Sequence, residues 1–359
     1  MKISIKTALT ILFIAINTAC SEDTEYRIDE GLNTETFETI TPMTMQMNSQ
    51  ATGAVISDEI YDYYRYLDGN SLMLYKKNRK SGKTTTLVTY PWSEEQTGEV
   101  LLSDLYLKDN YLYFVLFDYN AGMVNVWCRV PVDGSAPYKQ LRAFGNLYSG
   151  LYFDGDKVYV VRYGERNNPK TLNLMQVETG EFSHVYEIPD NLDPRFFYGG
   201  YLYGCNYKRI DDVFHTQICR WALDTPELEL VWDTDEIPVC IAHDSKLYVS
   251  LFETGRLFEM DLDGKNPNLL LKYNGLSLSN IHNGVLYFRI MQNNLLQTGI
   301  YRYTPGDKMP FPVYLSDNIA FESMITGTGD IWFTTEIEGS KFRFGQVGYV
   351  DRYNKYHAL

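Results

Sequence analysis

The stretch FEMDLDGK, residues 258–265, sets Asp261 and Asp263 beside Gly264. Paired carboxylates at this spacing could bind calcium or serve as an acid and a base. The corresponding stretches elsewhere in the chain read PVDG, VETG, LDTP and TPGD, which keep a turn but lose the carboxylate pair. Glycine suits a tight hairpin turn because it adopts a positive φ at little cost. We therefore interpret this stretch as a hairpin turn and not as a calcium or catalytic site.

The cysteines offer a second kind of chemistry. Four of them follow Cys20, and none belongs to a C-x-x-C pair of the kind that indicates zinc. Cys205 and Cys219 are symmetric about Asp212, so a hairpin centred there would bring their thiols together. In an exported protein this pair is a candidate disulfide. The alternative is that both are small buried apolar side chains.

Motifs for other catalytic chemistry are missing from the sequence. It contains no Gly-x-Ser-x-Gly, no His-Glu-x-x-His and no phosphate-binding glycine loop. His243 and His282 occupy equivalent positions in a repeat, but we expect them in separate turns. We therefore assign no catalytic residue, no metal ligand and no cofactor.

A strand-like phrase with a central aromatic residue recurs along the chain, as in YLYFV, KLYVS and VLYFR. Successive copies are 39 to 52 residues apart, and a glycine or asparagine turn follows six of the seven. The aromatic residues that mark the copies are Tyr61, Tyr113, Tyr159, Tyr203, Tyr248, Tyr287 and Trp332.

These repeats predict an all-β fold. Each repeat reads as four short strands, and four strands in roughly 40 to 50 residues are typical of a β-propeller blade. The sequence therefore predicts a β-propeller of seven four-stranded antiparallel blades, with six blades as the alternative because the first interval is the longest. Few residues remain after the third strand of the last repeat. We expect the segment ETFETITPMTMQM, residues 35–47, to close the ring as the outermost strand of the seventh blade.

The stretches LYVSLFETGRLFEMDLDGKN and LYFRIMQNNLLQTGIYRYTPGD resemble the repeats of YWTD propellers from the lipoprotein-receptor family and of related bacterial secreted propellers. The resemblance covers residues from about 54 to 355 and implies the propeller fold. It carries little information on function, because propellers host many unrelated activities.

Ligands of propellers usually bind on the face made by two sets of loops. One set joins the second and third strands of a blade, and the other joins successive blades. The charged residues that we expect on this face are Arg142, Asp190, Asp193, Arg195, Asp233, Asp235, Glu236, Asp317 and Glu322. The alternative is that these residues form a solvated acidic rim without a ligand.

The N-terminus reads as a targeting segment. Lys2 and Lys6 precede a short apolar run at residues 8–16, and INTACSEDTE resembles the end of a bacterial lipoprotein signal with Cys20 as the lipidated residue. A plain secretory signal is the alternative. We predict a signal peptide over residues 1–19, a flexible acidic tether over 20–35 and the propeller over 36–359. Ser21-Glu22-Asp23 resembles the surface-export tag of Bacteroidetes lipoproteins, which indicates the outer membrane, on its periplasmic side or at the cell surface.

The formal net charge of −14 argues against nucleic-acid binding, because a polyanion would be repelled. We expect an exported monomer that contacts the membrane only through its lipid and acts as a non-catalytic binding or assembly scaffold for a protein or glycan ligand. The alternative is a polysaccharide lyase or glycosidase with two ionisable groups converging in the central funnel.

Mass spectrometry of the mature protein should find an acylated Cys20, because the preceding signal directs lipid to that thiol. Replacement of Cys20 by Ser should release the protein from the membrane fraction. A mature N-terminus that starts at another residue and carries no lipid would contradict the lipoprotein prediction.

Overall fold

The computed structural model describes residues 37, 40–51, 53–68, 71–91, 100–118, 124–145, 148–163, 169–210, 213–223, 225–291, 295–316, 323–335 and 346–359. Residues 37–359 form one unit by their internal contacts. No helix in this described part is long and apolar enough to cross a membrane.

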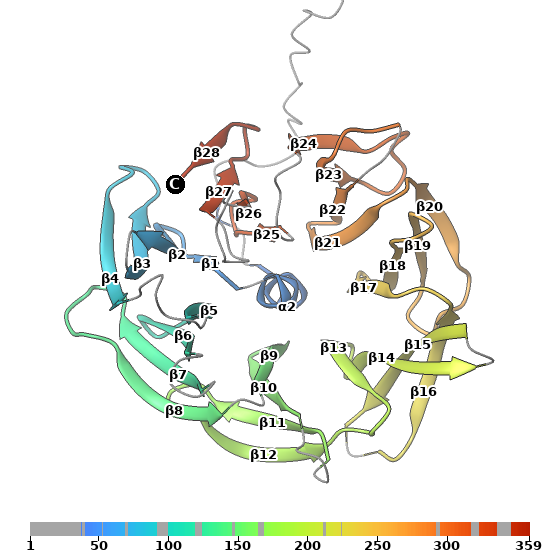
Figure 1. Cartoon of the computed structure of the whole chain (residues 1–359), viewed down its shortest axis with the longest axis horizontal. Helices are drawn as coiled ribbons and strands as arrows, with labels where there is room; N and C mark the ends of the chain where they lie inside the picture. Colours follow the sequence, from blue (N-terminus) through green and yellow to red (C-terminus); the bar gives the residue numbers. More distant parts are fainter. Residues whose placement is uncertain are drawn as a thin grey trace, which may run out of the picture. The chain divides into compact units, whose positions relative to one another are not determined.

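The predicted seven blades are confirmed. Seven sheets each contain four antiparallel strands in chain order, and they are arranged around a central axis (Figure 1). Blades lie on both sides of every sheet, so a strand can be apolar on both of its faces. In β18 (Lys246–Leu251) five consecutive residues are buried for this reason.

Each blade runs outward from its first strand to its fourth. The first four blades are β1 (Val55–Ser57), β2 (Tyr61–Asp68), β3 (Ser71–Asn78) and β4 (Thr84–Pro91); β5 (Val100–Lys108), β6 (Tyr111–Asp118), β7 (Val124–Pro131) and β8 (Lys139–Gly145); β9 (Tyr148–Asp154), β10 (Lys157–Arg162), β11 (Thr171–Gln176) and β12 (Glu181–Glu187); and β13 (Asp193–Tyr198), β14 (Tyr201–Ile210), β15 (Val213–Ala222) and β16 (Leu228–Thr234).

The remaining three blades follow the same order. They are β17 (Pro238–His243), β18, β19 (Arg256–Asp261) and β20 (Asn268–Lys272); β21 (Leu276–His282), β22 (Val285–Ile290), β23 (Gly299–Tyr303) and β24 (Phe311–Leu315); and β25 (Met324–Ile325), β26 (Ile331–Thr335), β27 (Gln346–Val350) and β28 (Tyr356–Ala358).

The repeated aromatic residue lies on the second strand of each blade and packs against the following blade. Tyr113, for example, packs in one cluster with Leu151 and Val158 of blade 3. Six of the seven predicted aromatic residues occupy this buried position. In blade 1 the prediction was displaced by two residues, because Tyr63 is fully buried and Tyr61 is only half-buried.

The stretch around Asp261 is the turn that the sequence predicted, since the Gly264 N–H donates to the Asp261 carbonyl at 2.8 Å. This turn joins blade 5 to blade 4, because the Leu262 carbonyl accepts from the hydroxyl of Tyr203 at 3.2 Å. Gly264 has φ of +81°, and a Cβ there would lie 1.8 Å from the carbonyl oxygen of Val231 in blade 4. The glycine is therefore required both by the turn and by the neighbouring blade.

The same contact recurs between other blades. Lys76 of blade 1 donates to the carbonyl of Val132 at 2.8 Å, and the indole N–H of Trp127 in blade 2 donates to the carbonyl of Val177 at 2.8 Å. Both carbonyls belong to the turn between the third and fourth strands of the following blade. We call these contacts turn clips, and they explain why that turn is repeated in the sequence.

The prediction that an N-terminal strand closes the ring is wrong. Residues Pro42–Gln50 form a helix, α2, which stands in the centre of the ring (Figure 1), and blade 7 takes its outermost strand, β28, from the C-terminal end. Thr41 caps the helix by accepting from the N–H of Thr44 at 3.1 Å, and Pro42 occupies the first turn. The segment whose alternating Thr and Met residues suggested a strand is instead a helix that is buried on almost all sides.

Polar side chains of α2 bond to the backbone of the innermost strands. Thr44 donates its hydroxyl proton to the carbonyl of Ile281 in β21 at 2.9 Å. The amide of Gln46 donates to the carbonyl of Leu151 in β9 at 2.9 Å and accepts from the N–H of Phe153 at 3.1 Å. These bonds satisfy backbone groups that face the channel.

Asn48 makes the densest set of these contacts. Its amide N–H donates to the carbonyl of Ile325 in β25 at 2.8 Å, and its amide oxygen accepts from the Ile325 N–H and from Asn280 of β21, both at 2.8 Å. At the next residue, the hydroxyl of Ser49 donates to the carboxylate of Asp104 in β5. The helix is thus tied to several blades at once.

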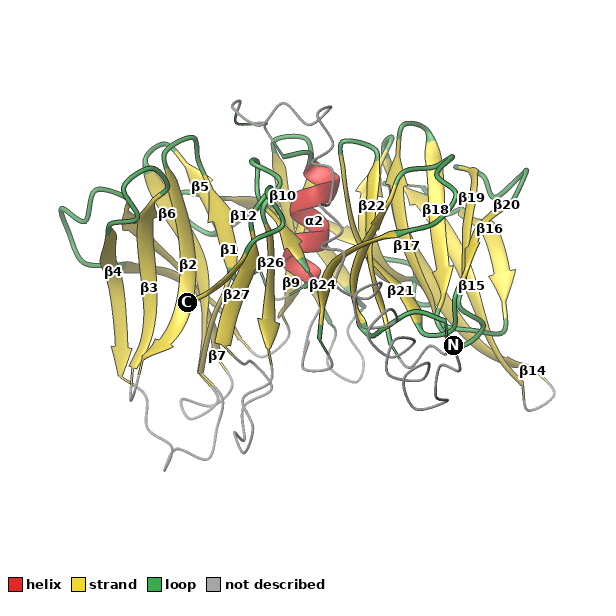
Figure 2. Cartoon of the chain, turned by 90° about the horizontal axis from the view of Figure 1, so that it is seen from above, coloured by secondary structure: helices red, strands yellow, loops and turns green. Residues whose placement is uncertain are grey.

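The two ends of the ring carry different connections. The turns that follow the first and third strands lie at one end, which we call the turn face, and the other connections lie at the opposite end, which we call the loop face (Figure 2). The N-terminal part of α2 bonds to β21 close to its turn, whereas Gln50 bonds to Arg195 near the start of β13. The helix therefore runs from the turn face to the loop face.

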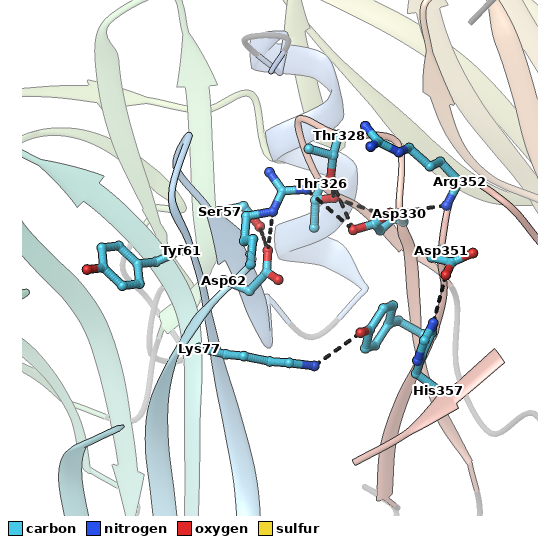
Figure 3. A network of polar contacts seen from close by, with 12 residues as sticks. Ser57, Tyr61, Asp62, Lys77, Thr326, Thr328, Asp330, Asp351, Arg352 and His357 are labelled. Atoms are coloured by element: carbon cyan, nitrogen blue, oxygen red, sulfur yellow. Dashed lines mark hydrogen bonds and ion pairs between the residues drawn. The ribbon is translucent and has the colours of Figure 1, made fainter. Parts of the chain in front are cut away.

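Blade 7 and blade 1 meet at a seam where the two blades share no strand of the described residues. Arg79 of blade 1 lies 3.5 Å from the carboxylate of Asp62 in the same blade and 3.6 Å from that of Asp330 in blade 7. Ser57 donates to Asp62 at 2.6 Å and Thr328 donates to Asp330 at 3.1 Å (Figure 3). The ion pairs replace part of the bonding that a shared strand would supply.

Aromatic packing completes the seam. The rings of Tyr64 and Trp332 are 5.4 Å apart, and Lys77 of blade 1 donates to the hydroxyl of Tyr349 in blade 7 at 3.1 Å. Burial raises the pKa of Asp62 and of Asp330, although Arg79 acts in the opposite direction on both carboxyls. The seam therefore holds two carboxyl groups that depend on one guanidinium.

Replacing Asn48 by Ala should destabilise the protein by about 3 kcal/mol, because it leaves the Ile325 backbone groups and the Asn280 amide buried without these partners. Urea unfolding followed by circular dichroism measures the change. Gln50→Ala is the matched control, because Gln50 is exposed and its loss should cost less than about 1 kcal/mol. Equal losses in the two variants would contradict the central role of Asn48.

Replacing Arg79 by Ala should cost about 3 kcal/mol at neutral pH, because two buried carboxylates lose their shared cation. The folded-state pKa of each carboxyl lies above 3.8, so the stability that these groups contribute is present below that pH and is lost as the pH rises through the raised values. The deficit of the variant should therefore shrink when the pH is lowered from about 7 to about 5.

Arg352→Ala is the control for this experiment, because the side chain of Arg352 is bonded to Tyr353 at an exposed site beside the seam. Its free energy of unfolding should stay within about 0.5 kcal/mol of the wild type. A deficit of Arg79→Ala that is independent of pH would rule out the carboxylates as its cause.

Candidate functional site

Arg195 is placed on the loop face by an irregularity in β13. Pro194 and Phe196 pair with consecutive residues of β14, so Arg195 is the extra residue of a β-bulge. A bulge re-aims the side chain that it contains and is common beside binding sites. Opposite the bulge, a Cβ on Gly204 would lie 2.4 Å from the carbonyl oxygen of Asp193, so only glycine permits this approach of the two strands.

Four side chains join at this bulge, and we call them the Arg195 cluster: Tyr163, Asp193, Arg195 and Tyr207. The guanidinium of Arg195 lies 3.2 Å from the carboxylate of Asp193 and donates to the hydroxyl of Tyr207 at 2.6 Å. Tyr163 donates to Asp193 at 3.1 Å. The two tyrosines are 36% and 37% exposed, so the cluster is reachable from solvent.

Both tyrosines of the cluster stay protonated at neutral pH. Burial raises the pKa of Tyr163, and the nearby Tyr152 and Asp193 raise it further. Burial also raises the pKa of Tyr207, against the effect of Arg195. Each hydroxyl can therefore donate a hydrogen bond as well as accept one.

Arg195 stays charged. Burial by itself would lower its pKa, but Cys205, Tyr207 and Asp193 raise the pKa overall. Burial also raises the pKa of the Cys205 thiol, although Arg195 lowers it. A protonated thiol is a poor nucleophile, so Cys205 is not activated for covalent chemistry.

The cluster is held in place from below by neighbouring elements. Gln50, at the end of α2, donates to the backbone carbonyl of Arg195. The hydroxyl of Tyr152 in β9 donates to the Pro194 carbonyl at 3.2 Å, and Lys170 donates to the Leu192 carbonyl at 3.0 Å. The central helix and blade 3 thus fix the backbone that carries Arg195.

Among the predicted loop residues that the structure describes, only Asp193 and Arg195 are in direct contact. Asp233 lies apart from them on β16, where it accepts from Gln217 at 2.8 Å and lies 3.5 Å from His215. Asp190 and Asp235 are exposed in the connections that precede β13 and β17, respectively.

Glu236 and Arg142 have structural surroundings. Glu236 is 4% exposed and accepts from the backbone N–H of Thr254 at 2.9 Å and from Arg256 at 3.2 Å, so it braces one loop against the next. Arg142 lies on the outermost strand of blade 2, with its guanidinium 4.7 Å from the ring centre of Phe182 in blade 3. Asp317 and Glu322, like Cys20, fall outside the described residues.

The candidate disulfide between Cys205 and Cys219 is not formed in the structure. All four cysteines of the described part are free and buried. Cys205 pairs with Ile218, and Cys219 pairs with Gly204, so the hairpin is centred half a residue before Asp212. Neighbouring residues of a strand point to opposite faces, which separates the two thiols.

Sequence reasoning missed Tyr163, Tyr207 and Gln50. Each of them reaches Asp193 or Arg195 from another element, and none belongs to a motif. Tyr207 lies on β14, which like β15 is ten residues long and carries the side chain toward the loop face, a length that only the structure gives.

No protein-family profile matches the chain, and no curated protein matches it either. Solved structures do match. The β-propeller domain of the Trilobed protease from Pyrococcus furiosus, described as having an open velcro topology, is 13% identical with a TM-score of 0.57, over 86% of this chain and 94% of that one.

Two further matches show the same fold. Pyrococcus horikoshii acylaminoacyl peptidase is 10% identical with a TM-score of 0.57, and the match covers 88% of this chain and 53% of that one. The chain thus spans about half the length of that peptidase. An oligogalacturonate lyase in complex with manganese is 14% identical with a TM-score of 0.51, over 86% of each chain. At these identities the likeness establishes the propeller fold alone.

Proposed function

We propose that this protein is a non-catalytic binding or assembly scaffold, exported and lipid-anchored at the cell envelope, that holds its protein or glycan ligand on the loop face. The observation that carries the proposal is the position of α2 in the channel (Figure 2). The helix stands on the axis of the ring and its last residue, Gln50, bonds to the backbone of Arg195, so we take the loop face, with the Arg195 cluster, as the ligand surface.

The position of α2 favours a scaffold over an enzyme with its site in the central funnel. A lyase or glycosidase of that kind needs two ionisable groups that converge over the channel. Thr44, Gln46 and Asn48 of α2 do not ionise at neutral pH and bond to the backbone of the inner strands, and the carboxylate of Asp104 in β5 is bonded to Ser49 of the same helix. The matched structures include a peptidase and a lyase, but their likeness to this chain is one of fold.

The cellular location rests on the sequence. The signal-like residues before Cys20 and the acidic residues after it support export, lipid attachment and placement at the outer membrane. The resemblance of the repeats to YWTD and bacterial secreted propellers supports export of the chain. A monomer with a lipid as its only membrane contact fits this role.

The test is capture of a ligand by the purified full chain from envelope extract, run beside a glycan array. Wild-type protein should retain a ligand without converting it, and Arg195→Ala should weaken retention about tenfold because the cation at the centre of the cluster is lost. Asp235→Ala, an exposed change on the same face, is the control and should retain the ligand fully. Turnover of any arrayed glycan would refute the scaffold.

A further inference from the structure

The balance of charge at the Arg195 cluster selects among ligand classes. Asp193 and Arg195 neutralise each other at 3.2 Å, and both tyrosines are uncharged at neutral pH. A cationic ligand would meet the guanidinium of Arg195, and a polyanion would meet a chain of net charge −14. The ligand that avoids both penalties carries no charge.

The pattern of hydrogen-bonding groups is equally selective. Tyr163, Asp193, Arg195 and Tyr207 form one continuous row in which hydroxyl, carboxylate, guanidinium and hydroxyl follow each other. The row presents acceptors and donors side by side, and sugar hydroxyls can use both at once. Bonds to the charged members of the row are stronger than bonds between neutral groups.

The tyrosine rings supply the apolar part of the surface. Tyr163 and Tyr207 are each about one third exposed, and each is tied through its hydroxyl to the ion pair. Tyrosine offers a rigid contact area at little cost in conformational entropy. The ammonium of Lys170 lies 5.4 Å from the ring centre of Tyr163, within the range of a cation–π contact.

We infer that the Arg195 cluster is a binding site for a neutral, hydroxyl-rich sugar. This inference rests on the proposed scaffold function and specifies its ligand. Gln50 and the bulge at Arg195 hold the row in place before a ligand arrives, so little order has to be created on binding.

Isothermal titration of the purified full chain tests the inference, with neutral and uronate-containing hexasaccharides chosen from a glycan array. A neutral sugar should bind, and its Kd should change less than about twofold between 0.05 and 0.5 M NaCl, because no charge is screened. Tyr163→Ala and Tyr207→Ala should each weaken binding about tenfold.

Conservative variants separate recognition from folding. Tyr163→Phe and Tyr207→Phe keep the ring and remove one hydroxyl, so they should weaken the same sugar about three- to tenfold with an unchanged Tm. Asp244→Asn is the control and should bind as the wild type does, because the side chain of Asp244 is 86% exposed in the turn after β17, on the turn face.

Three results would overturn the inference. The first is binding of uronate sugars alone with a steep dependence on salt. The second is neutral binding that none of the tyrosine variants changes. The third is capture of a protein from envelope extract with no neutral sugar bound on the array, which would leave the scaffold function standing. Failure to capture any ligand, protein or glycan, would refute the scaffold function as well.

Discussion

The hydrogen bonds between α2 and the innermost strands are the contacts on which the rest of the structure depends. Each blade presents the backbone edge of its first strand to the channel, and a buried N–H or C=O without a partner costs about 1–3 kcal/mol. Thr44, Gln46 and Asn48 supply partners for these groups in β9, β21 and β25. This is why a helix in the centre of the ring is polar where an ordinary core helix would be apolar.

A central helix also changes how the ring is held together. Blade 7 is built from contiguous C-terminal strands, so no strand is exchanged between the ends of the ring. The seam relies on Arg79 between two carboxylates and on the Tyr64–Trp332 contact. Elsewhere, turn clips such as Tyr203 to Leu262 join neighbouring blades. The helix and the seam together take the place of a closing strand.

The same helix connects the core to the candidate site. Gln50 ends α2 and bonds to the backbone of Arg195, whose bulge turns its side chain toward Asp193. The sequence predicted Asp193 and Arg195 on the loop face, because loop positions follow from the repeat period. It could not find Tyr163 or Tyr207, because the distances that unite them with the ion pair span different strands and blades. Prediction therefore reached the face but not the cluster.

The sequence by itself determined the number of blades, their four antiparallel strands, the buried aromatic residue of six blades and the hairpin turns, because these features follow from local periods and from glycine's freedom of φ. The tertiary structure alone decided three others. It made residues 42–50 a helix, because the channel offers backbone partners that a strand period does not reveal. It set the register that separates Cys205 from Cys219, since a shift of one residue reverses the face of every side chain. It also assembled the Arg195 cluster, because only packed blades bring distant residues within hydrogen-bonding distance.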